Sequence, residues 1–127
     1  MPDNLPSPLY ARKLQRRAAS SGFDLPGVEG PLASVRDELD ELVRADSEPV
    51  RFERLGDLLF AVVNLARKLH LDPELALRAA SDRFRSRVTA GGDLAASEGH
   101  SWDDLCTDEQ LAYYARARIS QGGNPQQ

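Results

Sequence analysis

Residues 50–70 form the segment that most constrains how this chain can fold. A helix at the surface of a globular protein buries one narrow apolar stripe. Here the apolar side chains cover a much wider arc of a helix. The segment therefore predicts a helix that packs on more than one side, and we expect a second subunit to cover part of it, as a homodimer or a dimer of dimers. The apolar residues are Leu55, Leu58, Leu59, Val62, Val63, Leu65, Ala66 and Leu69.

The segments before this helix also read as helices, and no stretch alternates as a strand would. Ser7 and Pro8 are a helix start, and the helix should stop at Gly22. Pro31 opens a second helix, and residues 46–49 form the tight turn into the third. These signals predict an antiparallel helix hairpin in the middle of the chain.

Two further helices are expected after it. One begins at Pro73 and should run to about Val88, where Gly91 and Gly92 would break it. The last follows a cap-like start at Thr107. The sequence therefore predicts an all-α fold, a four-helix module with a short extra C-terminal helix. We expect a flexible N-terminus at 1–8, a helical domain at 9–118 and a disordered tail at 119–127.

Composition narrows the classes of partner and compartment. A net charge of −4 argues against a nucleic-acid duplex as the main partner. The chain has no run of 18 apolar residues and no apolar signal segment, so we expect neither a membrane span nor secretion. Cys106 is the single cysteine and cannot form an internal disulfide. We therefore expect a cytoplasmic protein.

Carboxylates gather on the helix hairpin. A tight turn at 46–49 would put Glu38 level with Asp57 and Glu41 level with Arg54. Glu53, Asp57 and Asn64 share one stripe of the third helix. Carboxylates that meet in this way repel unless they are paired, protonated or bridged by a cation such as Mg²⁺. Two interpretations remain open at this point, a metal site and an ordinary solvated helix face on which Arg54 pairs with Glu41.

A family resemblance bears on that choice. The stretch "GFDLPGVEGPLASVRDELDEL", followed by "ERLGDLLFAVVNLARKLHLDPELALRAASDRFRSRV", resembles the MazG family of nucleoside triphosphate pyrophosphohydrolases, in particular its C-terminal-type catalytic domain. The similarity covers about residues 9–118. It implies an all-α four-helix domain that dimerises, binds Mg²⁺ or Mn²⁺ and hydrolyses NTPs or dNTPs to the monophosphate and pyrophosphate.

The resemblance also assigns metal ligands. The family's first acidic motif is retained as Glu38 and Glu41, and the aspartate of its second motif is Asp57. The glutamate of that second motif is replaced by Arg54, which cannot ligate a metal. Either Glu53 supplies the missing oxygen, or Arg54 captures Glu41 and the site is impaired. Glu41 or Glu53 would position or deprotonate the attacking water.

Residues that could contact the nucleotide are spread along the chain. Asn64 resembles the family's asparagine and would be a substrate or supporting hydrogen-bond partner, or else the filler of a polar gap. The basic residues could hold phosphate, and Tyr114 could stack on a base; the alternative for each basic residue is an ordinary solvated surface charge. The candidates are Lys13, Arg16, Arg17, Arg83, Arg87, Tyr114 and Arg118.

Two functions follow from this reading. The first is a Mg²⁺-dependent nucleotide pyrophosphohydrolase that clears the nucleotide pool. The alternative is a degenerate relative that binds nucleotide or a protein partner with weak or no hydrolysis, because of Arg54.

Overall fold

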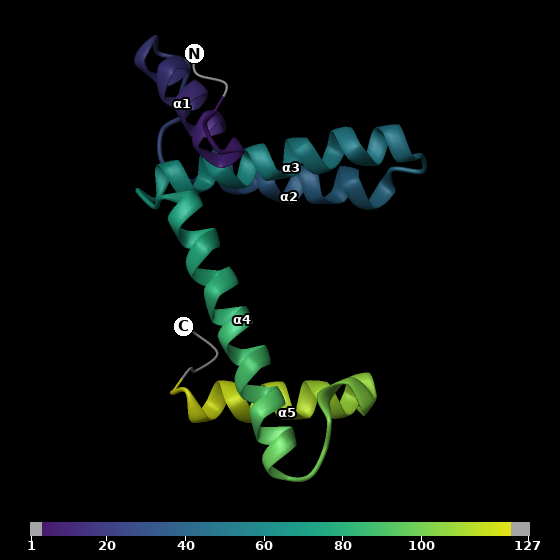
Figure 1. The fold of residues 1–127 in the computed structure, drawn as a ribbon. Coiled ribbons are helices and arrows are strands. Elements are labelled where there is room, and N and C mark those ends of the chain that lie inside the picture. Colours follow the sequence, from purple (N-terminus) through teal and green to yellow (C-terminus); the bar gives the residue numbers. More distant parts are fainter. Residues whose placement is uncertain (1–3, 123–127) are drawn as a thin grey trace. The chain divides into compact units, whose positions relative to one another are not determined.

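The computed structural model describes residues 4–122, and every regular element in that range is helical (Figure 1). This confirms the predicted all-α class. The flexible ends expected at 1–8 and 119–127 lie partly outside the described residues, and residues 7–8 and 119–120 are helical. The elements are α1 (Ser7–Ser20), α2 (Glu29–Arg44), α3 (Glu48–Lys68), α4 (Pro73–Ser97), the short 3₁₀ helix η1 (Trp102–Asp104) and α5 (Thr107–Ser120).

The chain divides into two compact units, and the boundary falls inside α4, between Leu77 and Arg78. The first unit holds α1, α2, α3 and the start of α4. The second holds the rest of α4, η1 and α5. None of the helices within residues 4–122 combines the length and the apolar content that crossing a membrane requires.

The first unit is built on the predicted hairpin of α2 and α3, which lie side by side in Figure 1. The turn between them is residues 45–47, slightly earlier than the expected 46–49. On α3, Ala61 and Val63 are buried. α1 packs against α3 through Gln15, whose side-chain Nε2 donates a hydrogen bond to the Phe60 carbonyl at 3.0 Å.

The ends of α1 and α3 have the same backbone arrangement. Gly22 (φ +93°) follows α1, and the Phe23 N–H donates to the Ala18 carbonyl. His70 (φ 60°) follows α3, and the Leu71 N–H donates to the Ala66 carbonyl. Both are C-terminal caps with one residue in the left-handed region. The predicted stop of the first helix at Gly22 is confirmed.

The predicted break of the fourth helix at Gly91 and Gly92 is wrong, because α4 continues through both glycines to Ser97. Gly91 is buried, and a Cβ at this position would lie 3.2 Å from Cζ3 of Trp102. Its function is to let another segment of the second unit approach the helix. The glycine that ends α4 is Gly99, which has φ +86°.

The start of α5 also differs in detail from the prediction. The backbone N–H of Cys106 donates a hydrogen bond to Glu109 Oε1 at 3.0 Å. The capping contact of α5 therefore starts at Cys106, one residue before the expected Thr107. The Gln110 side chain donates a hydrogen bond to the carbonyl of Trp102, at 2.9 Å. This second contact ties η1 to the first turns of α5.

Candidate functional site

Glu38 is the carboxylate of α2 with the most unusual environment. The side chain is half-buried, and its Oε2 is fully buried with no hydrogen-bond partner among the described residues. A buried, unpaired carboxylate oxygen is costly in free energy unless a proton or a cation meets it. The buried oxygen of Glu38 therefore calls for a proton or a cation as its partner.

On α3, Arg54 and Asp57 form an ion pair. Arg54 Nη1 lies 3.5 Å from Asp57 Oδ2, and the side chains are 37% and 46% exposed. The partner of Arg54 is thus the neighbouring acid on its own helix. The expected pair with Glu41 is not among the ion pairs of the described residues, and Glu41 and Glu53 are both exposed.

The bounds of α2 and α3 explain in part why Arg54 does not pair with Glu41. Because α2 ends at Arg44 and α3 begins at Glu48, counting back from the turn brings Glu38 level with Arg54 and within about one helical turn of Asp57. Arg54 thus stands at the level where a carboxylate would complete the acidic group.

The carboxylates are not gathered as a complete metal cage. Within residues 4–122, no three His, Cys, Asp or Glu side chains are close enough to hold a metal ion as they stand. Mg²⁺ in nucleotide enzymes is often bound by one or two carboxylates, with waters and substrate phosphates completing the shell. Glu38 and Asp57 could supply such a partial site if Asp57 is released from Arg54. The unpartnered Glu38 oxygen fits this use.

Asn64 belongs to a cluster that the sequence analysis did not foresee. Its Oδ1 accepts hydrogen bonds from Arg67 Nε at 3.1 Å and from Arg67 Nη2 at 2.8 Å. Arg67 Nη2 also donates to Asp24 Oδ1 at 2.7 Å, and Lys68 Nζ donates to Asp24 Oδ2 at 3.2 Å and to the Leu25 carbonyl at 2.7 Å. We call Asp24, Asn64, Arg67 and Lys68 the Asp24 cluster.

The Asp24 cluster ties the loop after α1 to the end of α3. Hydrogen bonds from Arg67 and then Lys68 lower the pKa of Asp24 below its ordinary value. Arg67 and Lys68 are well covered, with side chains only 13% and 14% exposed. Asp24 and Arg67 both lie in the stretches that resemble the MazG family. No local sequence pattern predicts a contact between residues that lie 43 positions apart.

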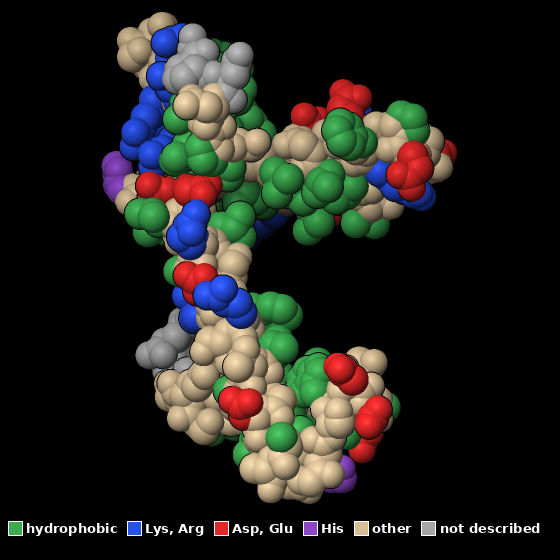
Figure 2. Space-filling model, in the orientation of Figure 1, with side chains coloured by type: hydrophobic (Ala, Val, Ile, Leu, Met, Phe, Trp, Pro, Cys, Tyr) green, Lys and Arg blue, Asp and Glu red, His purple; other side chains and the backbone are tan. Residues whose placement is uncertain are grey.

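The basic candidates of the first unit lie on α1. Figure 2 shows Lys and Arg side chains along this helix. Lys13, Arg16 and Arg17 are exposed, whereas Arg12 is half-buried and forms an ion pair with Asp72 at 3.4 Å. The three exposed cations are therefore the ones available to an anionic ligand.

The remaining candidates belong to the second unit. Arg83 is exposed, Arg87 and Arg118 are half-buried, and the Tyr114 ring lies 5.9 Å from the Phe84 ring. The Tyr114 ring is thus already engaged with an aromatic neighbour. A base could stack on it only from another side.

A second polar group in this unit was also not predicted. Glu98 accepts hydrogen bonds from Arg116 at 2.5 Å and from the Tyr113 hydroxyl at 2.8 Å. These contacts, that of Arg116 first, lower the pKa of Glu98 to about 2. The group is exposed and links the end of α4 to α5, so we assign it to stability rather than to chemistry.

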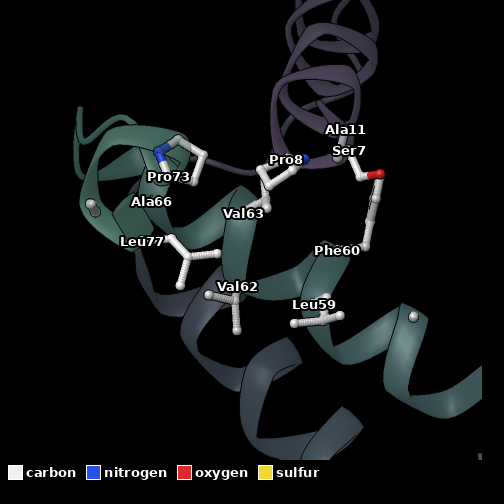
Figure 3. Close-up of a pocket in the computed structure, with 12 residues that line it drawn as sticks. Ser7, Pro8, Ala11, Leu59, Phe60, Val62, Val63, Ala66, Pro73 and Leu77 are labelled. Carbon is white, nitrogen blue, oxygen red and sulfur yellow. The ribbon is translucent and has the colours of Figure 1, made fainter. Parts of the chain in front are cut away.

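The first unit also has an apolar groove of about 720 Å³ (Figure 3). It lies between the start of α1, the middle of α3 and the start of α4. Leu59 and Ala66 lie about half a turn round α3 from Asp57, but Phe60, seven residues after Glu53, lies on the same side of the helix as that carboxylate, so the groove reaches the edge of the acidic stripe. The lining residues are Ser7, Pro8, Ala11, Gly56, Leu59, Phe60, Val62, Val63, Ala66, Pro73, Ala76 and Leu77.

Comparison with known proteins gives clear relatives, although no model of a known protein family matches the chain. The chain is 35% identical over 114 residues to the nucleoside triphosphate pyrophosphohydrolase/pyrophosphatase MazG of Thermotoga maritima. The match covers 90% of this chain and 45% of that protein. It is 36% identical over 104 residues to the nucleoside triphosphate pyrophosphohydrolase of Escherichia coli K12, covering 78% of this chain and 40% of the relative.

A shorter match of 63 residues, at 35% identity, joins half of this chain to the uncharacterized protein YabN of Bacillus subtilis. The chain thus spans less than half the length of the curated relatives it matches. The two long matches cover so much of this chain that both include the helix hairpin and its carboxylates. The described fold is all-α, as the resemblance implied. On this homology, the chain belongs to the MazG family of nucleoside triphosphate pyrophosphohydrolases.

Proposed function

We propose that this chain hydrolyses nucleoside triphosphates, NTPs or dNTPs, to the nucleoside monophosphate and pyrophosphate, with Mg²⁺ or Mn²⁺ as cofactor. Homology to the MazG proteins supports the reaction class. The single structural observation that carries the proposal is the buried, unpartnered Oε2 of Glu38 on the acidic hairpin.

Glu38 and Asp57 would hold the metal, which when bound offsets the negative charge of the triphosphate oxygens. Asp57 must first exchange its contact with Arg54 for the cation. Because that ion pair is partly exposed, it is worth little, and the exchange requires only a rotation of side chains.

The exposed carboxylates Glu41 and Glu53 are candidates to position the attacking water and accept its proton. Cleavage of the α–β phosphoanhydride bond then releases pyrophosphate, whose charge the cations Lys13, Arg16 and Arg17 would offset. Arg83, Arg87, Tyr114 and Arg118 belong to the second unit and are not assigned to this site.

A degenerate relative that binds nucleotide without turnover is the second candidate function. The observation that favours it is the ion pair between Arg54 and Asp57, which occupies the aspartate and puts a cation beside the place of the metal. Positive charge at this point weakens the binding of Mg²⁺.

We also propose that a second copy of the chain covers the apolar groove, giving a homodimer or a dimer of dimers. Exposed apolar residues of α3 support this, since Leu59 is 56% exposed and Val62 is 43% exposed. Leu59 and Ala66 of the groove lie on the side of α3 away from Asp57, so a partner packed on these two residues would leave Asp57 open. Nucleotide chemistry and the exposed free thiol of Cys106 fit a cytoplasmic location.

Pyrophosphate release from the eight common NTPs and dNTPs, with Mg²⁺ and with Mn²⁺, tests the reaction. We expect turnover of at least one nucleotide and a loss on the order of 100-fold in Glu38→Gln. The matched control is Glu29→Gln, which neutralises an exposed glutamate on the same helix and should leave turnover unchanged. A parent protein without turnover on every nucleotide would favour the degenerate relative.

A further inference from the structure

We infer that Arg67, itself held by Asp24, is a positioning residue that fixes the Asn64 carboxamide so that its Nδ2 donates a hydrogen bond to the nucleoside part of the substrate. This inference rests on the proposed function and deepens it. It gives the Asn64 carboxamide one orientation and the nucleoside as its partner, where the sequence left two roles open for this residue.

The orientation of Asn64 follows from the chemistry of its neighbour. A guanidinium has only donors, so the atom that meets Arg67 Nε and Nη2 has to be the amide oxygen. In a planar carboxamide the NH₂ group then points away from Arg67. No hydrogen bond from Nδ2 to another described residue occurs, and Asn64 is only half-buried, so a ligand can meet this donor.

Asp24 explains why Arg67 stays in place. Its carboxylate accepts a hydrogen bond at 2.7 Å from Arg67 Nη2, the same nitrogen that donates to Asn64 Oδ1, and so helps to hold the guanidinium in place. Because Arg67 is thereby held by two partners, the Asn64 amide has one favourable orientation. A donor fixed in advance loses less entropy when it binds a ligand.

The position of Asn64 indicates which part of a nucleotide it can meet. Asn64 lies seven residues after Asp57 on the same side of α3, which corresponds to about 10.5 Å along the helix axis. A triphosphate held by a cation at Asp57 would reach this distance with its sugar or base, not with the phosphates bound to the cation. In the other direction the stripe carries Glu53, which offers no donor when ionised.

The test is a binding measurement that does not depend on turnover. The ligands are the α,β-methylene analogues of ATP, GTP, CTP and dTTP, and inorganic tripolyphosphate, each titrated calorimetrically with Mg²⁺. Asn64→Asp keeps an acceptor for Arg67 but removes the amide donor. We expect it to weaken the preferred analogue about 2- to 10-fold. The affinity for tripolyphosphate should change less than about 2-fold, since the added charge is screened at this distance.

Two variants separate positioning from a purely structural effect. Arg67→Met frees the amide and should weaken the nucleotide analogue as Asn64→Asp does, and the double variant should be no weaker than either single one. Lys68→Met is the matched control, because it removes the other cation bound to Asp24 without touching Asn64. It should leave the nucleotide affinity unchanged. Melting temperatures show that each variant is folded.

Several results would overturn the inference. One is equal loss of affinity for the analogue and for tripolyphosphate in Asn64→Asp, and another is no loss for either ligand. A loss in Lys68→Met as large as in Arg67→Met would mean that the loop, not the amide, matters. A parent that binds the analogue but does not hydrolyse nucleotides would refute only the proposed function, whereas a parent that binds no nucleotide analogue would refute both.

Discussion

Replacement of Arg54 by glutamate is the most informative perturbation of this site. The change removes the ion pair with Asp57, whose atoms lie 3.5 Å apart, and puts two carboxylates one turn apart on α3. It also introduces the acid that the family resemblance implies at this position. The metal-free protein should therefore become less stable, while its affinity for Mg²⁺ should rise.

The magnitude follows from the exposure of the pair. Side chains that are 37% and 46% exposed form an ion pair worth about 0.2 to 1 kcal/mol, and like charges one turn apart cost a similar few tenths. The metal-free variant should thus lose about 0.5 to 1.5 kcal/mol of unfolding free energy, or about 2 to 8 °C in melting temperature for a domain of this size. A tenfold gain in Mg²⁺ affinity would add back about 1.4 kcal/mol at saturating metal.

Differential scanning fluorimetry with EDTA and with Mg²⁺, together with pyrophosphate release, measures both effects. Arg54→Gln is the control, because it removes the ion pair without adding a carboxylate. We expect only Arg54→Glu to gain a larger thermal shift with Mg²⁺ and faster hydrolysis. If both variants respond to Mg²⁺ alike, position 54 does not face the metal, and the reasoning is refuted. If Glu53 is already the ligand, Arg54→Glu should change turnover little and Glu53→Gln should remove it.

Two other predictions concern stability and assembly. Because Arg116 and Tyr113 lower the pKa of Glu98 to about 2 in the folded protein, against an ordinary 4.5, this carboxylate stabilises the fold fully above about pH 4.5 and progressively less toward pH 2. Thermal melts across this range should show a weaker pH dependence in Glu98→Gln, and identical curves would contradict the assignment. Leu59→Arg puts a charge into the apolar groove at a side chain that is 56% exposed, so the variant should fold but sediment as a smaller species than the parent. A parent that is monomeric at micromolar concentration in light scattering would rule out the proposed assembly.

The sequence by itself determined the helices and the acidic candidates. Periodic apolar residues and the glycine after the first helix specify local backbone structure, because both act through neighbours a few residues away. The same local reasoning failed at Gly91. There the helix continues, because the absence of a side chain is used for close packing near Trp102 and not for a change of backbone direction.

The condition of each candidate side chain was decided only by the tertiary structure. The sequence placed Glu38 and Asp57 on facing helices, but it could not show that Arg54 binds Asp57 or that one oxygen of Glu38 is buried without a partner. Nor could it show that Asp24 and Arg67, 43 residues apart, fix the orientation of Asn64. Hydrogen bonds and burial depend on which segments are in contact in the folded protein. Those contacts result from packing between helices, which no local sequence pattern encodes.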